Sequence, residues 1–487
     1  MLVYISLFPP PLFPHLSLAM RPSDGPGGDG RRRVVLFPLP YQGHINPMLR
    51  LAAALHARGL AITVVHTETR APDRQKLPGD FDLVTIRDGV APELAESDDV
   101  APFVLALNRS CAAPFRDYLA GARDVACVVA DVDWFAPLGV ARELGVKALP
   151  LMTSSAAKFR VYMAFPLLEE KGYLPIRESN LDTKVKELPP LLVRDMHHEK
   201  DEARYRAYAH LLSNMVSGVR QSSGLILNTL DAIEENGIAN IYKDISIPVF
   251  AIGPLHILSP SVDSSLLLQD RSCLQWLDAQ PPGSVIYVSL GSLMSIDAHE
   301  LTEIAWGLVA SRRPFLWVIR PGLVRGREVS ELSIELQEEI RDRGRMVSWA
   351  PQQEVLKHPA VGAFLTHCGW NSTLESILEG VPMICRPLGG DQLCNARYVC
   401  EVWKVGFRMV EAENQLTRGD VQVAIEKMMG QKEGDEIRER MRDLRDAAAK
   451  CTSKGGPTDV SLQRLVGFIV SPYTTGKLAF STGHRTA

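Results

Sequence analysis

Short apolar runs alternate with helical patterns along most of the chain. The first apolar run spans residues 34–37, and after the turn segment YQGHINP apolar side chains recur at helical spacing from Met48 to Leu55. We expect Asn46 to be the N-cap of this helix and Pro47 to be its first residue. The segment AITVVHT follows as a second strand. This strand–helix–strand opening predicts a parallel sheet that is covered on both faces.

The same alternation continues in two blocks. Strands are predicted at DVACVVADVDWF, VKALPLMTSS and GLILNTL, and then, after a segment rich in Ser and Pro, at GSVIYVSLGS, FLWVIR, MVSWA, VGAFLTH and PMICR. We therefore predict an α/β fold of two Rossmann-like, doubly wound domains. The polar segment RESNLDTKVKELPPLLVRDMHHEKDE between the blocks is expected to be a surface loop over a binding cleft. The expected division is a disordered leader at 1–30, a first domain at 31–252, a linker at 253–272, a second domain at 273–456, and a C-terminal helix with a loose tail at 457–487.

Length and composition narrow the class of protein. The chain has 487 residues, which is too many for one core, and a net charge of -4 without a long basic run, so nucleic acid is not an expected partner. Its eight cysteines form no CxxC pair, which favours a reducing compartment. The first thirty residues contain several prolines and no basic start, unlike a signal peptide or a membrane helix. We expect a cytoplasmic monomer with no membrane span.

The segment THCGWNSTLESILEGVP combines a strand end with the start of a helix. Unpaired backbone N–H groups and the helix dipole at such a start attract phosphate. Gly369, Asn371 and Ser372 lie in this turn, and His367 at the strand end adds a further donor. The pattern predicts a phosphate or diphosphate site, and the alternative is a capped helix with an incidental histidine.

Five more polar or aromatic residues lie after strand ends or on the same helix. Glu375 can accept bonds from two ribose hydroxyls, and Trp349 can stack on a base. Asp391 and Gln392 suit sugar hydroxyls, and Ser292 can reach a phosphate. Because strand ends of a parallel sheet share one edge, these groups are expected to meet. Together they predict a site for a nucleotide sugar.

The stretch from Trp349 to Gln392 resembles the forty-four-residue signature of plant family-1 UDP-glycosyltransferases, through WAPQ, HCGWNS, LE and DQ. The resemblance extends from about Arg33 through QGHINPML, SCLQWLDAQPPGSVIYVSLGS and NARYVCEVWKVG, and it is strongest to the group that contains benzoxazinoid and steviol glucosyltransferases. It implies a GT-B fold, with UDP-glucose as donor substrate, a small-molecule acceptor and no cofactor.

The resemblance also implies a role for each matched residue. Trp349 would stack on uracil, the main chain of Ala350 would contact its edge, and Gln352 and Glu375 would bind ribose. The diphosphate would be held by His367, Asn371, Ser372 and Ser292, with Gly369 in the same turn. The sugar would be held by Trp370, Asp391, Gln392 and Thr153. In this family a final Gln goes with glucose. The chain departs from the usual FFGDQ at LGGDQ, where Gly389 removes a side chain beside the sugar and the acceptor.

His44 and Asp131 are the predicted catalytic pair. Both lie at strand ends of the first block, and histidine has a pKa suited to taking a proton from an attacking hydroxyl. A buried carboxylate can orient the imidazole and stabilise its charged form. The resemblance selects the same two residues. We expect direct displacement with inversion, from α-linked UDP-glucose to a β-glucoside of a small lipophilic plant metabolite.

Three alternatives are weighed against this interpretation. The DVD segment at 131–133 resembles a metal-binding DxD motif, although it lies far from the uridine signature, and we expect no metal. A dinucleotide oxidoreductase would need a GxGxxG turn, which PYQGHINP does not supply. A non-catalytic nucleotide-sugar-binding protein of the same fold is the remaining alternative. The acceptor is not determined and can be a benzoxazinoid, terpenoid, flavonoid, hormone or foreign phenol.

Overall fold

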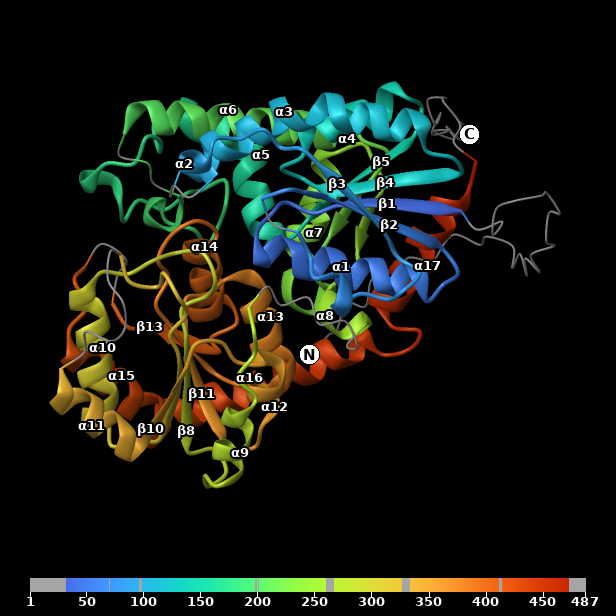
Figure 1. Ribbon diagram of the computed structural model, residues 1–487. Helices are drawn as coiled ribbons and strands as arrows, with labels where there is room; N and C mark the ends of the chain where they lie inside the picture. The colour runs from blue at the N-terminus through green and yellow to red at the C-terminus, as the bar shows by residue number, and fades with distance from the viewer. Residues whose placement is uncertain are drawn as a thin grey trace, which may run out of the picture.

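Two parallel sheets face each other across the molecule in the computed structural model (Figure 1). The expected leader at 1–30 and the end of the expected tail lie outside the residues that the structure describes, which are 32–69, 71–95, 99–197, 199, 201–259, 267–325, 333–410 and 414–472. Within these ranges every helix is too short or too polar to cross a bilayer.

The first sheet has seven strands in the order β3-β2-β1-β4-β5-β6-β7. The central strands are apolar on both faces, so both faces must be covered by helices. Helices α1, α8 and α17 cover one face, and α3 to α6 cover the other (Figure 1). The strands are β1 Arg33–Phe37, β2 Ala61–Thr67, β3 Asp82–Ile86, β4 Val125–Asp131, β5 Lys147–Met152, β6 Leu225–Leu227 and β7 Val249–Ala251. The helices are α1 Gln42–His56, α2 Pro92–Ala95, α3 Val100–Gly121, α4 Phe135–Glu143, α5 Ala156–Glu170, α6 Glu202–Arg220, α7 Asp231–Asp244, α8 Leu255–Leu258 and α17 Pro457–Val470.

The second sheet has six strands in the order β10-β9-β8-β11-β12-β13. Helices α10, α11 and α15 pack on one face, and α9 and α12 pack on part of the other. The strands are β8 Val285–Ser289, β9 Phe315–Val318, β10 Gly344–Val347, β11 Val361–Thr366, β12 Met383–Cys385 and β13 Gly406–Arg408. The helices are α9 Ser272–Asp278, α10 Ala298–Ala310, α11 Ile334–Arg343, α12 Gln352–Lys357, α13 Trp370–Glu379, α14 Gln392–Arg397, α15 Arg418–Gly430 and α16 Lys432–Thr452.

These two sheets confirm the predicted GT-B architecture of two doubly wound layers. Strand order reverses between β1 and β4 in the first sheet and between β8 and β11 in the second. Ligands of open parallel sheets bind at such reversals, outside the carboxyl ends of the strands. The position of the site therefore follows from the strand order of each sheet. The domain boundaries given above stay a prediction.

Helix α1 begins earlier than the sequence predicted. Its first residue is Gln42 and its N-cap is Tyr41, so Asn46 is not the cap and Pro47 lies inside the helix. A proline there cannot donate to the carbonyl four residues before it, which belongs to Gly43. That carbonyl instead accepts a hydrogen bond of 2.8 Å from the side chain of Asn371 in the second domain. The predicted start of the helix was wrong because a contact between the domains satisfies the carbonyl that Pro47 leaves free, so the helix can begin one turn earlier.

The long polar segment before α6 is more than a surface loop. Asp195 in this segment is fully buried and binds Arg397 at 2.6 Å and Arg408 at 3.3 Å, both from the second domain. Leu191 and Val193 beside it are also buried. The prediction of a surface loop was wrong at this point because a buried charge pair and apolar side chains anchor the segment between the domains.

One apolar cluster is shared by the two domains. Leu230 and Ile233 of the first domain pack with Trp370 and Leu374 of α13 and with Met441 of α16. Farther along, α17 returns to the first domain, where its apolar side chains join the core beneath β1 and β2 (Figure 1). The domains are therefore joined by apolar packing and by the returning helix as well as by the linker.

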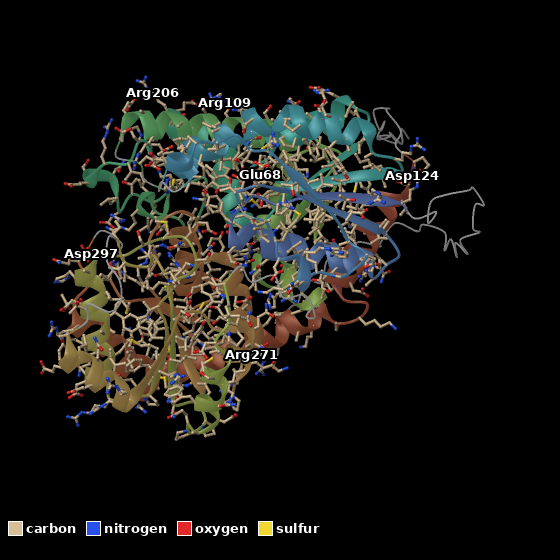
Figure 2. All side chains as sticks on the ribbon, in the orientation of Figure 1. Glu68, Arg109, Asp124, Arg206, Arg271 and Asp297 are labelled. Carbon is tan, nitrogen blue, oxygen red and sulfur yellow. The ribbon has the colours of Figure 1, made fainter. Side chains whose placement is uncertain are left out.

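Charged side chains of both signs cover the outer surface. Figure 2 labels exposed examples from both domains, namely Glu68, Arg109, Asp124, Arg206, Arg271 and Asp297. This mixture agrees with the small net charge of -4.

We predict that Asp195→Asn destabilises the protein. The substitution keeps the shape of the side chain but leaves Arg397 and Arg408 without their buried carboxylate. Removing one partner of a buried ion pair typically costs about 3–5 kcal/mol, so the free energy of unfolding in urea should fall by roughly that amount.

Asp446→Asn is the matched control, because Asp446 pairs with Arg445 at the surface, where the two side chains are 61% and 41% exposed. An exposed pair typically contributes about 0–1 kcal/mol. Equal losses for the two variants would contradict the proposed anchoring role of Asp195.

Candidate active site

A cleft of about 1110 Å³ lies between the two sheets, at their facing strand reversals. Of the residues predicted from the sequence, only Asp131 is absent from its lining, because it is buried behind His44. The structure brings all the others to this one cavity, namely His44, Thr153, Ser292, Trp349, Ala350, Gln352, His367, Gly369, Trp370, Asn371, Ser372, Glu375, Asp391 and Gln392.

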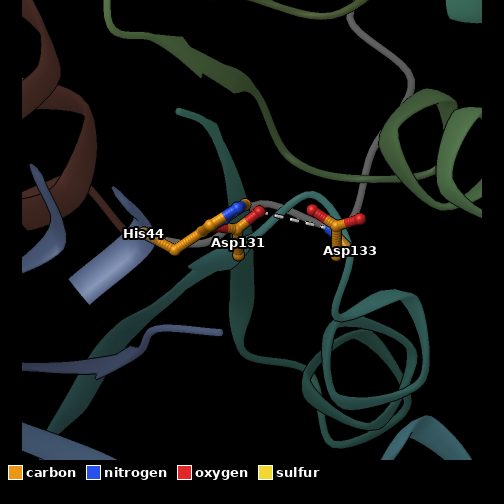
Figure 3. A group of neighbouring side chains, drawn as sticks. All are labelled: His44, Asp131 and Asp133. Atoms are coloured by element: carbon orange, nitrogen blue, oxygen red, sulfur yellow. Dashed lines mark hydrogen bonds and ion pairs between the residues drawn. The ribbon is translucent and has the colours of Figure 1, made fainter. Parts of the chain in front are cut away.

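His44 and Asp131 form a hydrogen-bonded pair (Figure 3). His44 lies in the first turn of α1, and Asp131 is the last residue of β4. Nδ1 of His44 lies 2.5 Å from Oδ2 of Asp131 and 3.1 Å from the hydroxyl of Thr153. The imidazole lines the cleft, so Nε2 is the nitrogen left for a substrate. Such a pair can take a proton from a bound hydroxyl.

The charges around His44 set its proton affinity. Burial lowers the pKa of His44, but the charge and hydrogen bond of Asp131, with the charges of Asp133 and Asp391, outweigh burial and raise the pKa to about 9. His44 in turn holds the pKa of Asp131 below its usual value despite the burial of that carboxyl. The free imidazole is therefore a strong base that is mostly protonated at neutral pH.

Asp133 makes this pair a group of three. Its carboxylate and the ligand atoms of His44 and Asp131 all lie within 4.8 Å of one another (Figure 3). Burial, followed by the charge of Asp131, raises the pKa of Asp133 well above its usual value. The alternative that the DVD segment binds a metal ion is thus consistent with the geometry of these three residues. Asp131, however, already binds His44 through Oδ2 and the backbone N–H of Asp133 through Oδ1, at 3.4 Å.

His367 lies between two glycines at the opposite wall of the cleft. A Cβ at Gly291 would lie 2.3 Å from Nε2 of His367, and a Cβ at Gly369 would lie 2.4 Å from it. The ring therefore requires glycine at both positions, a reason the sequence did not suggest for Gly369. Burial lowers the pKa of His367 to about 4, so the ring is neutral at pH 7. A hydrogen bond with the backbone of Ser289 opposes this shift, and the residue lines the cleft, where a ligand can meet it.

The first turn of α13 contacts both the cleft and the first domain. Its N-cap is Gly369, with no side-chain cap. The amide of Asn371 binds the Gly43 carbonyl and also Asn228, at 3.3 Å. The indole of Trp370 is buried and donates to the Asn228 carbonyl at 2.7 Å. The indole is thus engaged by the first domain. The first N–H groups of α13 have no partner within the helix, and residues 369–372 line the cleft.

Polar side chains of α12 and α13 form a hydrogen-bonded network along the cleft. Nε2 of Gln352 lies 2.7 Å from Glu375 and 2.9 Å from Ser372, and Gln353 binds the other oxygen of Glu375 at 3.0 Å. Burial raises the pKa of Glu375, and the bonds from both glutamines oppose that shift. Trp349 is half-buried at the neighbouring strand end. This arrangement places a carboxylate, an amide and an aromatic face along one wall.

The Asp391–Gln392 turn is held by both domains. Oδ2 of Asp391 accepts from Ser154 of the first domain at 2.5 Å and from Asn395 at 3.1 Å. Gln392 accepts from the backbone of Leu388 at 2.8 Å, which leaves its NH₂ group for a ligand. A Cβ at Gly389 would lie 3.1 Å from the Met294 methyl group, so Met294 occupies part of the space that the missing side chain leaves.

Sequence reasoning missed several residues that hold the site in place. Asn228 connects β6 to α13, and Ser154 connects β5 to Asp391. Arg320 is buried and donates to the carbonyls of Gly291 and Met294, at 2.9 and 2.6 Å, which positions the loop that carries Ser292. Asn228 directly follows β6 and Ser154 comes two residues after the end of β5, so the strand-end rule that selected His44 and Asp131 could have selected them.

Two facing Rossmann-like sheets, a helix N-terminus with a histidine on one wall and a His–Asp pair on the other define a nucleotide-sugar transferase of the GT-B class. Comparisons with known proteins agree. Residues 266–441 match the family "UDP-glucoronosyl and UDP-glucosyl transferase". The chain is 51% identical over 444 residues to DIMBOA UDP-glucosyltransferase BX9 of Zea mays, which covers 89% of this chain and 95% of the relative. The chain belongs to this family, as a plant family-1 UDP-glycosyltransferase.

Solved structures show the same architecture. Os79 from O. sativa in complex with UDP is 27% identical, covers 90% of this chain and 100% of its own, and has a TM-score of 0.76. Phytolacca americana UGT2, complexed with UDP-2fluoro-glucose and pterostilbene, is 29% identical, covers 90% of this chain and 99% of its own, and has a TM-score of 0.74. The family and the GT-B fold inferred from the sequence are confirmed.

The raised pKa of His44 gives a testable pH dependence. Because the deprotonated imidazole takes the proton, kcat/KM with an alcohol acceptor should rise with pH until about 9. Asp131→Asn removes the charge that raises this pKa and leaves burial, which lowers it. The rising limb of the plot of kcat/KM against pH should therefore move to lower pH, and the maximum value should fall. A pH series of kcat/KM measures both changes.

Asp133→Asn is the graded control, because Asp133 raises the pKa of His44 less than Asp131 does. Its rising limb should move in the same direction by a smaller amount. An unmoved limb in Asp131→Asn would show that a different group titrates.

Proposed function

We propose that this protein transfers glucose from UDP-glucose to a hydroxyl or carboxyl group of a small apolar metabolite and inverts the anomeric centre. The observation that carries the proposal is the His44–Asp131 pair at 2.5 Å, which faces the N-terminus of α13 across one cleft. The alternative, a non-catalytic nucleotide-sugar-binding protein, leaves this pair and its position in the cleft without a purpose.

The donor would lie along the wall formed by the second domain. Trp349 would stack on uracil with the Ala350 backbone at its edge, and the connected Gln352 and Glu375 would bind ribose. The diphosphate would meet the N–H groups at the start of α13 and the neutral His367, with Asn371, Ser372 and Ser292 around it. The sugar would meet Asp391, Gln392, Thr153 and the backbone of Trp370.

The reaction would then be a single displacement. His44 takes the proton of the acceptor hydroxyl through Nε2, and Asp131 stabilises the imidazolium that forms. The acceptor oxygen bonds to the anomeric carbon as the bond from that carbon to the β-phosphate oxygen breaks. UDP leaves with the electron pair. The donors at the start of α13 would be oriented toward this developing charge before the reaction, so they would need little reorganisation.

The acceptor would occupy the part of the cleft that the first domain lines. Its walls include apolar and aromatic side chains, among them Leu39, Tyr162, Tyr208, Leu211 and Met215, which suit a small ring compound. A relative whose name gives DIMBOA as its acceptor supports this size class. We further propose that the protein acts in the cytoplasm, since all eight cysteines are free thiols. A monomeric state is proposed as well.

Incubation of wild-type protein and His44→Ala with UDP-glucose and a panel of acceptors tests the function. Wild-type protein should form a β-glucoside and should prefer UDP-glucose to UDP-galactose. General base catalysis contributes about 10²–10⁴-fold, so kcat for an alcohol acceptor should fall by roughly that range in His44→Ala.

The UDP affinity of His44→Ala serves as the internal control. It should stay near the wild-type value, because the donor wall belongs to the other domain. Near-full turnover of an alcohol by His44→Ala would refute the assigned base. A loss of UDP binding that matches the loss of turnover would instead place His44 in the donor site.

The reaction should need no divalent cation. The proposed diphosphate site uses backbone N–H groups and a neutral histidine, and Asp131 is engaged by His44. Turnover in excess chelator should equal turnover without it. Loss of activity that manganese restores would favour the alternative in which His44, Asp131 and Asp133 hold a metal ion.

A further inference from the structure

Lys158 is a buried cation at the wall of the cleft. It is the third residue of α5, its side chain is 1% exposed, and it lines the same cavity as His44. Its ammonium group donates to the Gly390 carbonyl at 3.2 Å and lies 5.2 Å from the centre of the Tyr162 ring. Neither the His44–Asp131 pair nor the proposed donor site uses this ammonium group.

The carboxylates near Lys158 are bound by other partners. Glu234 accepts from the backbone N–H groups of Ala156 and Ala157 and from a threonine hydroxyl. Asp391 accepts from Ser154 and Asn395. Within the described ranges Lys158 makes no ion pair. Burial lowers the pKa of Lys158, and the charges of Cys394 and Asp391 oppose that shift from farther away. A buried charge without an opposite partner is costly, so such a group is retained where a ligand supplies the missing charge.

The bond to the Gly390 carbonyl uses one of the three ammonium hydrogens of Lys158, so two remain for a ligand. Gly390 lies beside the sugar-binding turn, and Tyr162 covers one side of the ammonium group. Tyr162 and Tyr208 line the acceptor part of the cleft. The ammonium group therefore lies where an acceptor bound on these rings adjoins the sugar. The diphosphate site at the start of α13 belongs to the opposite wall.

We propose that Lys158 determines acceptor specificity by binding the anionic form of an acidic acceptor, such as a phenol, an N-hydroxy compound or a carboxylic acid. This inference rests on the proposed function and narrows its acceptor class. The bound anion forms the bond to the anomeric carbon while the bond to the β-phosphate oxygen breaks, and UDP leaves with the electron pair. No proton has to be removed within the complex, so an acidic acceptor depends less on His44.

A pair of acceptors and a pair of variants test the inference. The acceptors are 4-nitrophenol, which is largely ionised in slightly alkaline buffer, and 4-nitrobenzyl alcohol, which stays neutral. Lys158→Gln removes the charge and keeps a donor for Gly390, and Lys158→Met removes both. Both variants should lose about 10- to 100-fold in kcat/KM for the phenol, as expected for a lost hydrogen bond to a charged group. The alcohol should change by less than about 3-fold, within the range of an indirect effect.

Two further measurements separate a structural role from recognition. If Lys158 only holds the Gly390 carbonyl, Lys158→Gln keeps wild-type kcat/KM for both acceptors and Lys158→Met lowers both equally, and either result overturns the inference. Removal of an unpaired buried charge should leave the thermal midpoint of Lys158→Met unchanged or higher. A fall in that midpoint together with loss of both activities would show that the lysine is structural.

Equilibrium binding distinguishes failure of this inference from failure of the proposed function. With UDP present at saturation, calorimetry should show that wild-type protein binds 4-nitrophenol about 10-fold or more tightly than Lys158→Gln does. Equal affinities would overturn the role of Lys158 even if glucoside forms. Tighter wild-type binding without any glucoside would support Lys158 as an anion-binding residue and count against the proposed transfer.

Discussion

The hydrogen bond from the Asn371 side chain to the Gly43 carbonyl connects the two strand reversals on which the site depends. It is possible because Pro47 lacks the N–H group that would otherwise bind this carbonyl within α1. Asn228 extends the contact by binding both Asn371 and the Trp370 indole. The first turn of α1 and the first turn of α13 are thereby placed against each other. His44 faces the proposed phosphate site because these two helix starts are joined.

Buried polar groups make this contact specific to one arrangement of the domains. Asp195 requires the two arginines of the second domain, and Asp391 requires Ser154 of the first. Such groups are costly to bury without their partners, so any displacement of one domain would leave them unsatisfied. The apolar cluster around Trp370 supplies the non-specific part of the attraction. Apolar packing and buried polar contacts together fix the distance between the two domains, and the cleft lies between them.

Much of the fold and most of the candidate site could be predicted because parallel strands follow a strict rule. Their carboxyl ends share one edge, so polar residues directly after apolar runs must meet there. That rule gathered His44, Trp349, His367 and Asp391 without a structure. Three short strands, β3, β7 and β13, were not predicted, because runs of three to five residues carry a weak pattern. The start of α1 was misplaced because a proline usually marks a first turn. Asp195 was missed because a carboxylate in a polar segment carries no local sign of burial.

The sequence by itself determined the two doubly wound sheets, the strand-end chemistry and the family. These features depend on local patterns of polarity and on residue types at fixed spacing. Only the tertiary structure decided how the residues are used. It buried the Trp370 indole between the domains, joined Asn371 to the first domain and placed His367 between two glycines. It also bound the buried ammonium group of Lys158 to a backbone carbonyl. Each of these outcomes depends on contacts between residues far apart in the chain. The free energy of burying a polar group depends on those contacts, so no single stretch of sequence can predict it.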